Sequence, residues 1–182
     1  MRVQMMVAAA GLLVSGMAMG QAAAPAAAPA GPSGPASEVQ RGYAGQKDNI
    51  LKTAERMPEA SYQFKPTADV RTFARVLNHV TEAQFRSCGI ANHVAVADIA
   101  KPPSDTADKA TIIAGLKASF VECDKAFAAT TDANFTEMLP AGRASRSRAG
   151  LMWGTVSHDN EQYSTLALYL RLKGLVPPSS EK

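Results

Sequence analysis

Residues 111–127 read TIIAGLKASFVECDKAF, a stretch in which apolar side chains recur at steps of three and four residues. This spacing places the apolar side chains on one face of a helix and is typical of helices that pack at shallow angles. Cys123 lies within this face, so we expect its side chain to point into a core. The recurring positions are Ile113, Leu116, Phe120, Cys123 and Phe127.

Three further segments show the same helical spacing and have recognisable ends. Ser37 and Gln40 form the pattern of a capping box before the first of them, and Pro58 ends that helix. Gly174 can take the left-handed conformation that ends the last helix. We expect the four helices over residues 37–57, from about 72 to 89, from 104–108 to 127, and from about 147 to 173.

No stretch alternates apolar and polar residues for long enough to predict a β-sheet. Pro140 and Gly142 instead break the chain between the third and the fourth helix. Four amphipathic helices joined in this way predict an all-α fold, a four-helix bundle that covers residues 38–182.

The N-terminal part of the chain differs in composition from the rest. Arg2 is the only charged side chain before residue 37. A short basic start, an apolar run and small residues make residues 1–20 resemble a signal peptide for export, whereas the Ala- and Pro-rich residues 21–37 predict a disordered linker. The alternative is an uncleaved anchor, but an apolar run of about 15 residues is short for a bilayer span. We therefore expect a periplasmic or secreted protein with no membrane span after signal removal.

Length and charge exclude several classes of protein. The chain has 182 residues, of which 46% are hydrophobic, so it can bury a core and is not wholly disordered. Its formal net charge is +3, and removing Arg2 with the signal lowers this to about +2. Nucleic-acid binding usually needs a basic face, so this balance argues against a nucleic-acid partner.

Cys88 and Cys123 are the only cysteines. In an exported protein an isolated pair of this kind indicates a disulfide. The alternative is a reactive thiol near a histidine, which requires a reducing compartment or a protected cysteine.

Two histidines lie close to apolar faces of different helices. His158 and Gln162 are in register with the apolar positions of the last helix, and His79 borders the apolar face of the second. Imidazoles from facing helices can bind a divalent metal in a bundle core. The alternative is that both are core histidines held by hydrogen bonds. His93 follows the second helix in a loop-like stretch and is expected at the surface.

Three arginines precede the last helix, at positions 143, 146 and 148. Together with the amides of the helix start they could hold an anion. The alternative is a solvated basic loop, which is the commoner role of such a cluster.

Several stretches resemble the exported branch of the DinB/YfiT-like family, and the resemblance extends over residues 48–180. It implies a four-helix bundle of unusual connectivity that binds a divalent metal, such as nickel or zinc, through three histidines. His79 and His158 match two of these positions, and Gln162 stands where the family has the third. The stretches are DNILKTAERMP at 48–58, YQFKPT at 62–67, VRTF at 70–73, HDNEQY at 158–163 and LYLRLKGLVPPSS at 168–180.

Gln162 has a direct consequence for the function that the resemblance implies. A side-chain amide is a weak ligand, so we expect a zinc, nickel or iron ion to be weakly bound. A neighbouring carboxylate in place of the Gln162 amide would bind the ion more strongly. A metal site with open coordination positions would support a metal-dependent hydrolase or transferase acting on a small molecule. The alternative is a non-catalytic binding or stress-related bundle whose metal site has decayed. We also consider a homodimer as a possible assembly of this protein. The carboxylates in question are Glu82, Asp159 and Glu161.

Overall fold

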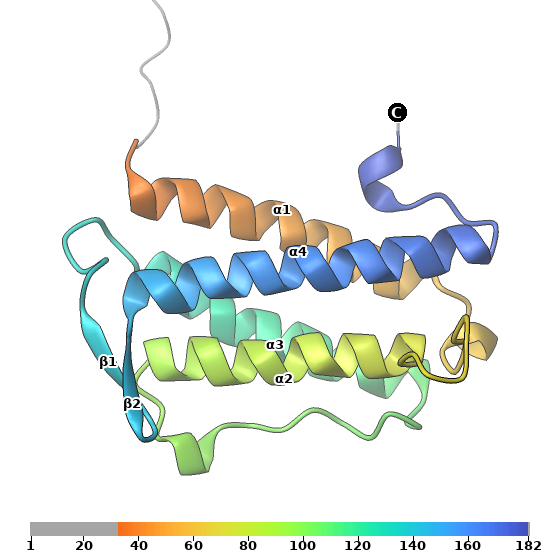
Figure 1. Ribbon diagram of the computed structural model, residues 1–182, viewed down its shortest axis with the longest axis horizontal. Helices are drawn as coiled ribbons and strands as arrows, with labels where there is room; N and C mark the ends of the chain where they lie inside the picture. The colour runs from red at the N-terminus through yellow and green to blue at the C-terminus, as the bar shows by residue number, and fades with distance from the viewer. Residues whose placement is uncertain (1–32, 182) are drawn as a thin grey trace, which may run out of the picture. The chain divides into compact units, whose positions relative to one another are not determined.

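Four long helices lie lengthwise beside one another in the computed structural model, which describes residues 33–181 (Figure 1). The all-α four-helix bundle predicted from the sequence is confirmed. None of the described helices is long and apolar enough to cross a membrane. The predicted signal peptide and most of the predicted linker lie outside the described residues. The helices are α1 (Pro35–Arg56), α2 (Phe73–Ala91), α3 (Lys109–Ala128) and α4 (Arg148–Leu172), with 3-10 turns η1 (Glu59–Ser61), η2 (Val96–Asp98) and η3 (Pro178–Ser180).

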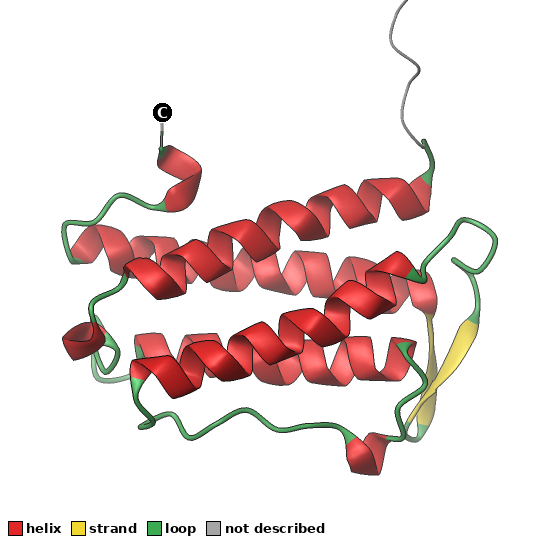
Figure 2. Ribbon diagram, turned by 180° about the vertical axis from the view of Figure 1, so that it is seen from behind, coloured by secondary structure: helices red, strands yellow, loops and turns green. Residues whose placement is uncertain are grey.

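The helices run in two opposite directions. α1 and α4 run one way along the bundle, and α2 and α3 run the other way (Figures 1 and 2). Because α2 and α3 are parallel neighbours, the segment of residues 92–108 must return along the whole bundle before α3 begins. A long crossover of this kind distinguishes the fold from a simple up-and-down bundle.

A disulfide joins Cys88 on α2 to Cys123 on α3, with 4.9 Å between the two Cα atoms. This is the pair that the sequence predicts, and both residues are fully buried. Nearby, the ring of Tyr43 on α1 stacks on the ring of Phe127 with 4.0 Å between centroids. Three helices therefore meet in one apolar core at this end of the bundle.

α1 begins earlier than the sequence predicts. Its cap is Gly34 and Pro35 opens the helix, so the predicted capping box at Ser37 is wrong. The Ser37 hydroxyl instead donates to the carbonyl of Gly34, and the amide of Ala36 donates to a carboxylate oxygen of Asp132 at 2.8 Å. A Cβ at Gly34 would clash with that carboxylate. The helix start thus depends on a residue far along the chain.

A short β-hairpin separates α3 from α4, where the sequence analysis expected no sheet. β1 (Met138–Ala141) pairs antiparallel with β2 (Ala144–Ser147). The turn is possible because Gly142 adopts a φ of 81°, a conformation that glycine takes without strain. Strands of four residues are too short to show a clear alternation, which is why the pattern did not predict them.

Arg148, the first residue of α4, fixes the hairpin to the bundle. Its guanidinium donates to one carboxylate oxygen of Glu137 at 2.9 and 2.7 Å and to the carbonyl of Ala91 at 3.1 Å. The side chain of Arg148 is almost fully buried, and the partly exposed carboxylate of Glu137 neutralises its charge at 2.7 Å. This arginine therefore holds the start of α4 against the end of α2.

Candidate functional site

The two histidines singled out in the sequence lie side by side in the structure. His79 on α2 and His158 on α4 face each other with 3.2 Å between their Nε2 atoms. The rings are inclined at 69° to each other, with 4.9 Å between centroids. The antiparallel packing of α2 and α4 thus brings together two imidazoles that lie 79 residues apart.

Each of these imidazoles has a carboxylate on the side away from its partner. Nδ1 of His158 is 3.8 Å from Oδ1 of Asp159, and Nδ1 of His79 is 4.0 Å from Oε2 of Glu82. Both distances exceed that of a hydrogen bond, and both Nδ1 atoms are buried without a partner. A carboxylate beside the outer nitrogen is the usual surrounding of a metal-binding histidine.

A series of buried hydrogen bonds begins at Asp159, next to His158, and crosses the bundle. Oδ2 of Asp159 accepts a hydrogen bond from Gln84 at 2.8 Å, and Oε1 of Gln84 accepts one from Ser119 at 2.8 Å. All three residues have 0% exposure. These hydrogen bonds link α4, α2 and α3, so they fix the backbone that carries His158.

The sequence did not predict most of these buried hydrogen bonds. Gln84 had no predicted role, and Asp159 was considered as a carboxylate beside His158 that could replace the weak ligand Gln162. The available signal was spacing, because Asp159 follows Val156 by three residues and precedes Tyr163 by four, which puts it on a buried face.

The environment shifts two pKa values at this site. Burial lowers the pKa of the His79 imidazole below its usual value, and the positive charge of Arg71 lowers it further. Burial raises the pKa of Asp159, an effect that the nearby His158 imidazole and the hydrogen bond from Gln84 partly oppose. A lowered histidine pKa favours the neutral imidazole, which is the form that binds metals.

We expect Asp159→Asn to remove a pH dependence of the free energy of unfolding. An unfolded aspartate has a pKa of about 3.9, and the folded chain holds this proton more tightly. The free energy of unfolding of the unchanged chain should therefore fall as pH rises from about 4 through the raised pKa, by at most about 1.4 kcal/mol per pH unit. Asparagine can still accept from Gln84 and carries no charge. Urea titrations between pH 4 and 7 measure the difference.

Asp98→Asn is the matched control, since Asp98 is an exposed aspartate in η2. It should keep the pH profile of the unchanged chain. Identical profiles for Asp159→Asn and the unchanged chain would show that the buried carboxyl does not carry this effect.

Gln162, the third residue predicted to ligate a metal, is one turn beyond His158 on α4. Its side chain is largely buried and makes no hydrogen bond within residues 33–181. The carboxylates of Glu82 and Asp159 lie on the Nδ1 sides of the histidines, and Glu161 is exposed. In the described part of the chain, no group of three or more His, Cys, Asp or Glu side chains is placed to hold a metal ion.

The histidine pair by itself fits two ligands of one cation. Zinc binds imidazole nitrogen at about 2.0–2.1 Å, so two nitrogens of a tetrahedral site lie roughly 3.3–3.4 Å apart. The 3.2 Å between the Nε2 atoms of His79 and His158 is close to this value. Gln162, four residues after His158 on α4, is also largely buried.

A cavity of about 220 Å³ borders His158. It lies between α2 and α4 and has both polar and apolar walls. One end contains His158 and Asp159, and the other end contains Gly150 and the hairpin residue Arg146. The lining is completed by Ala83, Gln84, Ser87, Leu151, Gly154 and Thr155.

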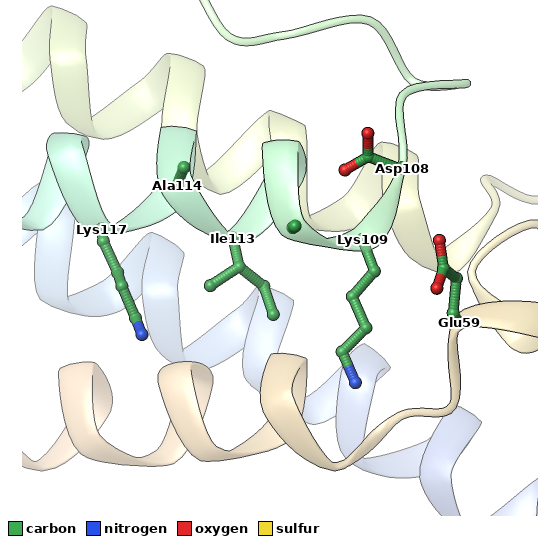
Figure 3. A pocket seen from close by; sticks show the side chains of 7 residues that line it. Glu59, Asp108, Lys109, Ile113, Ala114 and Lys117 are labelled. Atoms are coloured by element: carbon green, nitrogen blue, oxygen red, sulfur yellow. The ribbon is translucent and has the colours of Figure 1, made fainter.

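A more open hollow of about 610 Å³ lies beside the start of α3 (Figure 3). Its two lysines already have partners in the bundle. Lys109 donates to the carbonyls of Glu55 and Met57 at the end of α1, and Lys117 pairs with the Glu55 carboxylate at 2.9 Å. These contacts give the lysines a structural role, so the cavity beside His158 is the better candidate site.

The family model of the DinB superfamily matches residues 43–166. The chain belongs to the DinB superfamily. Its structure is similar to a DinB-like protein from Bacillus cereus, with 14% identity and a TM-score of 0.62 over 78% of this chain and 95% of that one. It is also similar to a DinB-like protein from Bacillus subtilis, with 12% identity and a TM-score of 0.61 over 75% and 92%. No curated protein matches the chain. At these identities the solved structures support the fold alone.

Proposed function

We propose that this DinB-superfamily protein binds one divalent cation, such as Zn²⁺, Ni²⁺ or Fe²⁺, and hydrolyses a small molecule. His79 and His158 supply the two strong ligands, and Gln162 supplies a weak third one. The observation that carries the proposal is the 3.2 Å between the two Nε2 atoms, each on an imidazole with a carboxylate near its other nitrogen.

Residues around the two histidines favour the neutral form of His79 and hold His158 in place. The lowered pKa of His79 keeps one ligand neutral, and the Gln84–Asp159 hydrogen bond holds the helix turn that carries His158. A cation bound here would polarise a carbonyl and lower the pKa of a bound water. The adjoining cavity has room for a small substrate beside His158.

We place this activity outside the cytoplasm. The disulfide between Cys88 and Cys123 is typical of an oxidising compartment. Export also favours hydrolysis over transfer to a low-molecular-weight thiol, because such thiols belong to the reducing cytoplasm. The predicted signal peptide agrees with this compartment.

Metal binding by untagged protein tests the proposal directly. We expect the purified chain to contain substoichiometric metal and to bind up to one Zn²⁺ or Ni²⁺ per chain in equilibrium dialysis. His79→Ala should abolish this binding because it removes one of two imidazoles. His93→Ala is the matched control, since His93 is exposed in the turn after α2 and should bind metal like the unchanged chain.

Two results would contradict the metal site. One is no binding by the unchanged chain at millimolar metal. The other is an equal loss of binding in His79→Ala and His93→Ala, which would indicate adventitious surface binding.

The second candidate function is a non-catalytic bundle whose metal site has decayed. The observation in its favour is that the described residues offer two strong ligands and not three. An Nε2–Nε2 distance of 3.2 Å also suits a direct hydrogen bond between the two rings. In that case His79→Ala lowers the free energy of unfolding while the unchanged chain binds no metal.

A further inference from the structure

Arg146 lines the cavity beside His158 without an acidic partner among the described residues. Its one hydrogen bond is a long one, from Nη2 to the carbonyl of Gly150 at 3.4 Å. Its neighbour Arg148, in contrast, is neutralised by Glu137 at 2.7 Å. Arg146 and Arg148 therefore have separate roles, and the guanidinium of Arg146 has no acidic partner among the described residues.

Two glycines keep this side of α4 free of side chains. A Cβ added at Gly154 would meet nothing within 4 Å, and one added at Gly150 would meet Ser147 Oγ at 3.1 Å. Both glycines line the cavity, one turn apart. Glycine within a helix lowers its stability by about 1 kcal/mol relative to alanine. The two glycines thus leave open space next to Arg146, although they lower the stability of α4.

The cavity is chemically different at its two ends. From Gly150, beside Arg146, to His158 is roughly 12 Å along the helix axis. Between them the walls are mixed: Ala83 and Leu151 are apolar, and the hydroxyl of Ser87 is unbonded among the described residues. A short ligand held at Arg146 therefore extends toward the histidine pair.

We propose that this cavity binds a small monocarboxylate whose carboxylate pairs with Arg146. The planar guanidinium matches a carboxylate in a two-point contact. A single negative charge fits best, because Arg146 is the one arginine or lysine in the lining. The assignment of such acids as substrates rests on the proposed function. The binding itself does not require a metal.

The test uses hexanoate and its neutral analogue hexanamide as probes, with metal removed by a chelator. Binding is followed through the NMR amide signals of Gly150 and Gly154. We expect hexanoate to bind with a millimolar Kd and hexanamide at least about tenfold more weakly, since a charged hydrogen-bond pair is lost. Arg146→Ala should weaken hexanoate by about the same factor. Arg143→Ala is the control, because Arg143 lies in the hairpin turn outside the cavity lining and should not change binding.

A second variant tests the space and not the charge. Gly154→Leu places a side chain where nothing lies within 4 Å of the new Cβ, so we expect the helix to accommodate it and hexanoate binding to be lost. Equal binding of hexanoate and hexanamide, equal effects of Arg143→Ala and Arg146→Ala, or undiminished binding in Gly154→Leu would each overturn the proposal. Repeating the titration in His79→Ala separates the two proposals, because this variant should bind hexanoate normally while binding no metal.

Discussion

Replacing both Cys88 and Cys123 by alanine is expected to lower the free energy of unfolding by about 4 kcal/mol. The disulfide spans 35 residues, and closing a loop of that size removes entropy from the unfolded chain. For a chain of this size the loss corresponds to a fall in melting temperature of roughly 10 °C. Calorimetry and urea unfolding measure the two quantities.

The place of the disulfide makes this the largest stability effect that we expect. α2 and α3 are parallel and joined by the long segment of residues 92–108, so the unfolded chain gains much freedom without the bond. Gln84 and Ser119 lie one turn before the two cysteines, and the loss should therefore also loosen their hydrogen bond.

Reduction of the unchanged chain provides the control for the double variant. Reduced protein should melt close to the variant, because both lack the same cross-link. A fall in melting temperature of less than about 2 °C in both would contradict the expected contribution of the bond. A large fall in the variant alone would instead indicate a packing defect at the alanines.

The sequence predicts the helices well where their ends depend on neighbouring residues. Thr72, Asp108 and Ser147 each cap a helix through their own side chains, at 3.1, 2.7 and 3.1 Å from the amide three residues on. Gly174 takes the expected left-handed conformation after α4, with a φ of 73°. In these cases the interaction that sets the boundary is local, so the pattern of residues is sufficient.

Prediction failed where a distant residue sets the structure. The start of α1 depends on Asp132, which lies 96 residues after the amide that it accepts from. The hairpin before α4 is anchored by Arg148, which reaches Glu137 and the end of α2. Neither contact can be recognised from the residues around it. The local pattern therefore favoured a capping box at the start of α1 and an irregular loop before α4.

The candidate site combines both situations. Helical spacing placed His158 and Gln162 on one face of α4 and His79 near the apolar edge of α2. The 3.2 Å between the imidazoles depends on the relative register of α2 and α4, which spacing within one helix does not determine. The same holds for Arg146, whose place at the cavity follows from the hairpin.

Gln162→His is expected to raise the affinity for Zn²⁺ or Ni²⁺ by at least about 100-fold. A neutral imidazole is a much stronger ligand for these ions than an amide oxygen. Changes in residues behind the ligands alone alter metal affinity by about 10–100-fold, so a change of ligand should exceed that range. The new histidine lies one turn beyond His158, and the two would form the spacing that places ligands on one helix face. Competition with a chelator of known affinity measures the gain.

Two further variants decide whether this gain arises at the predicted place. Gln63→His adds a histidine at an exposed position in the α1–α2 connection and should leave the affinity unchanged. Combining Gln162→His with His79→Ala should remove most of the gain, because the added imidazole then has only His158 as a partner. An unchanged affinity in Gln162→His, with His79 and His158 both present, would exclude the proposed arrangement of ligands. An equal gain with and without His79 would place the cation on α4 alone, away from the pair.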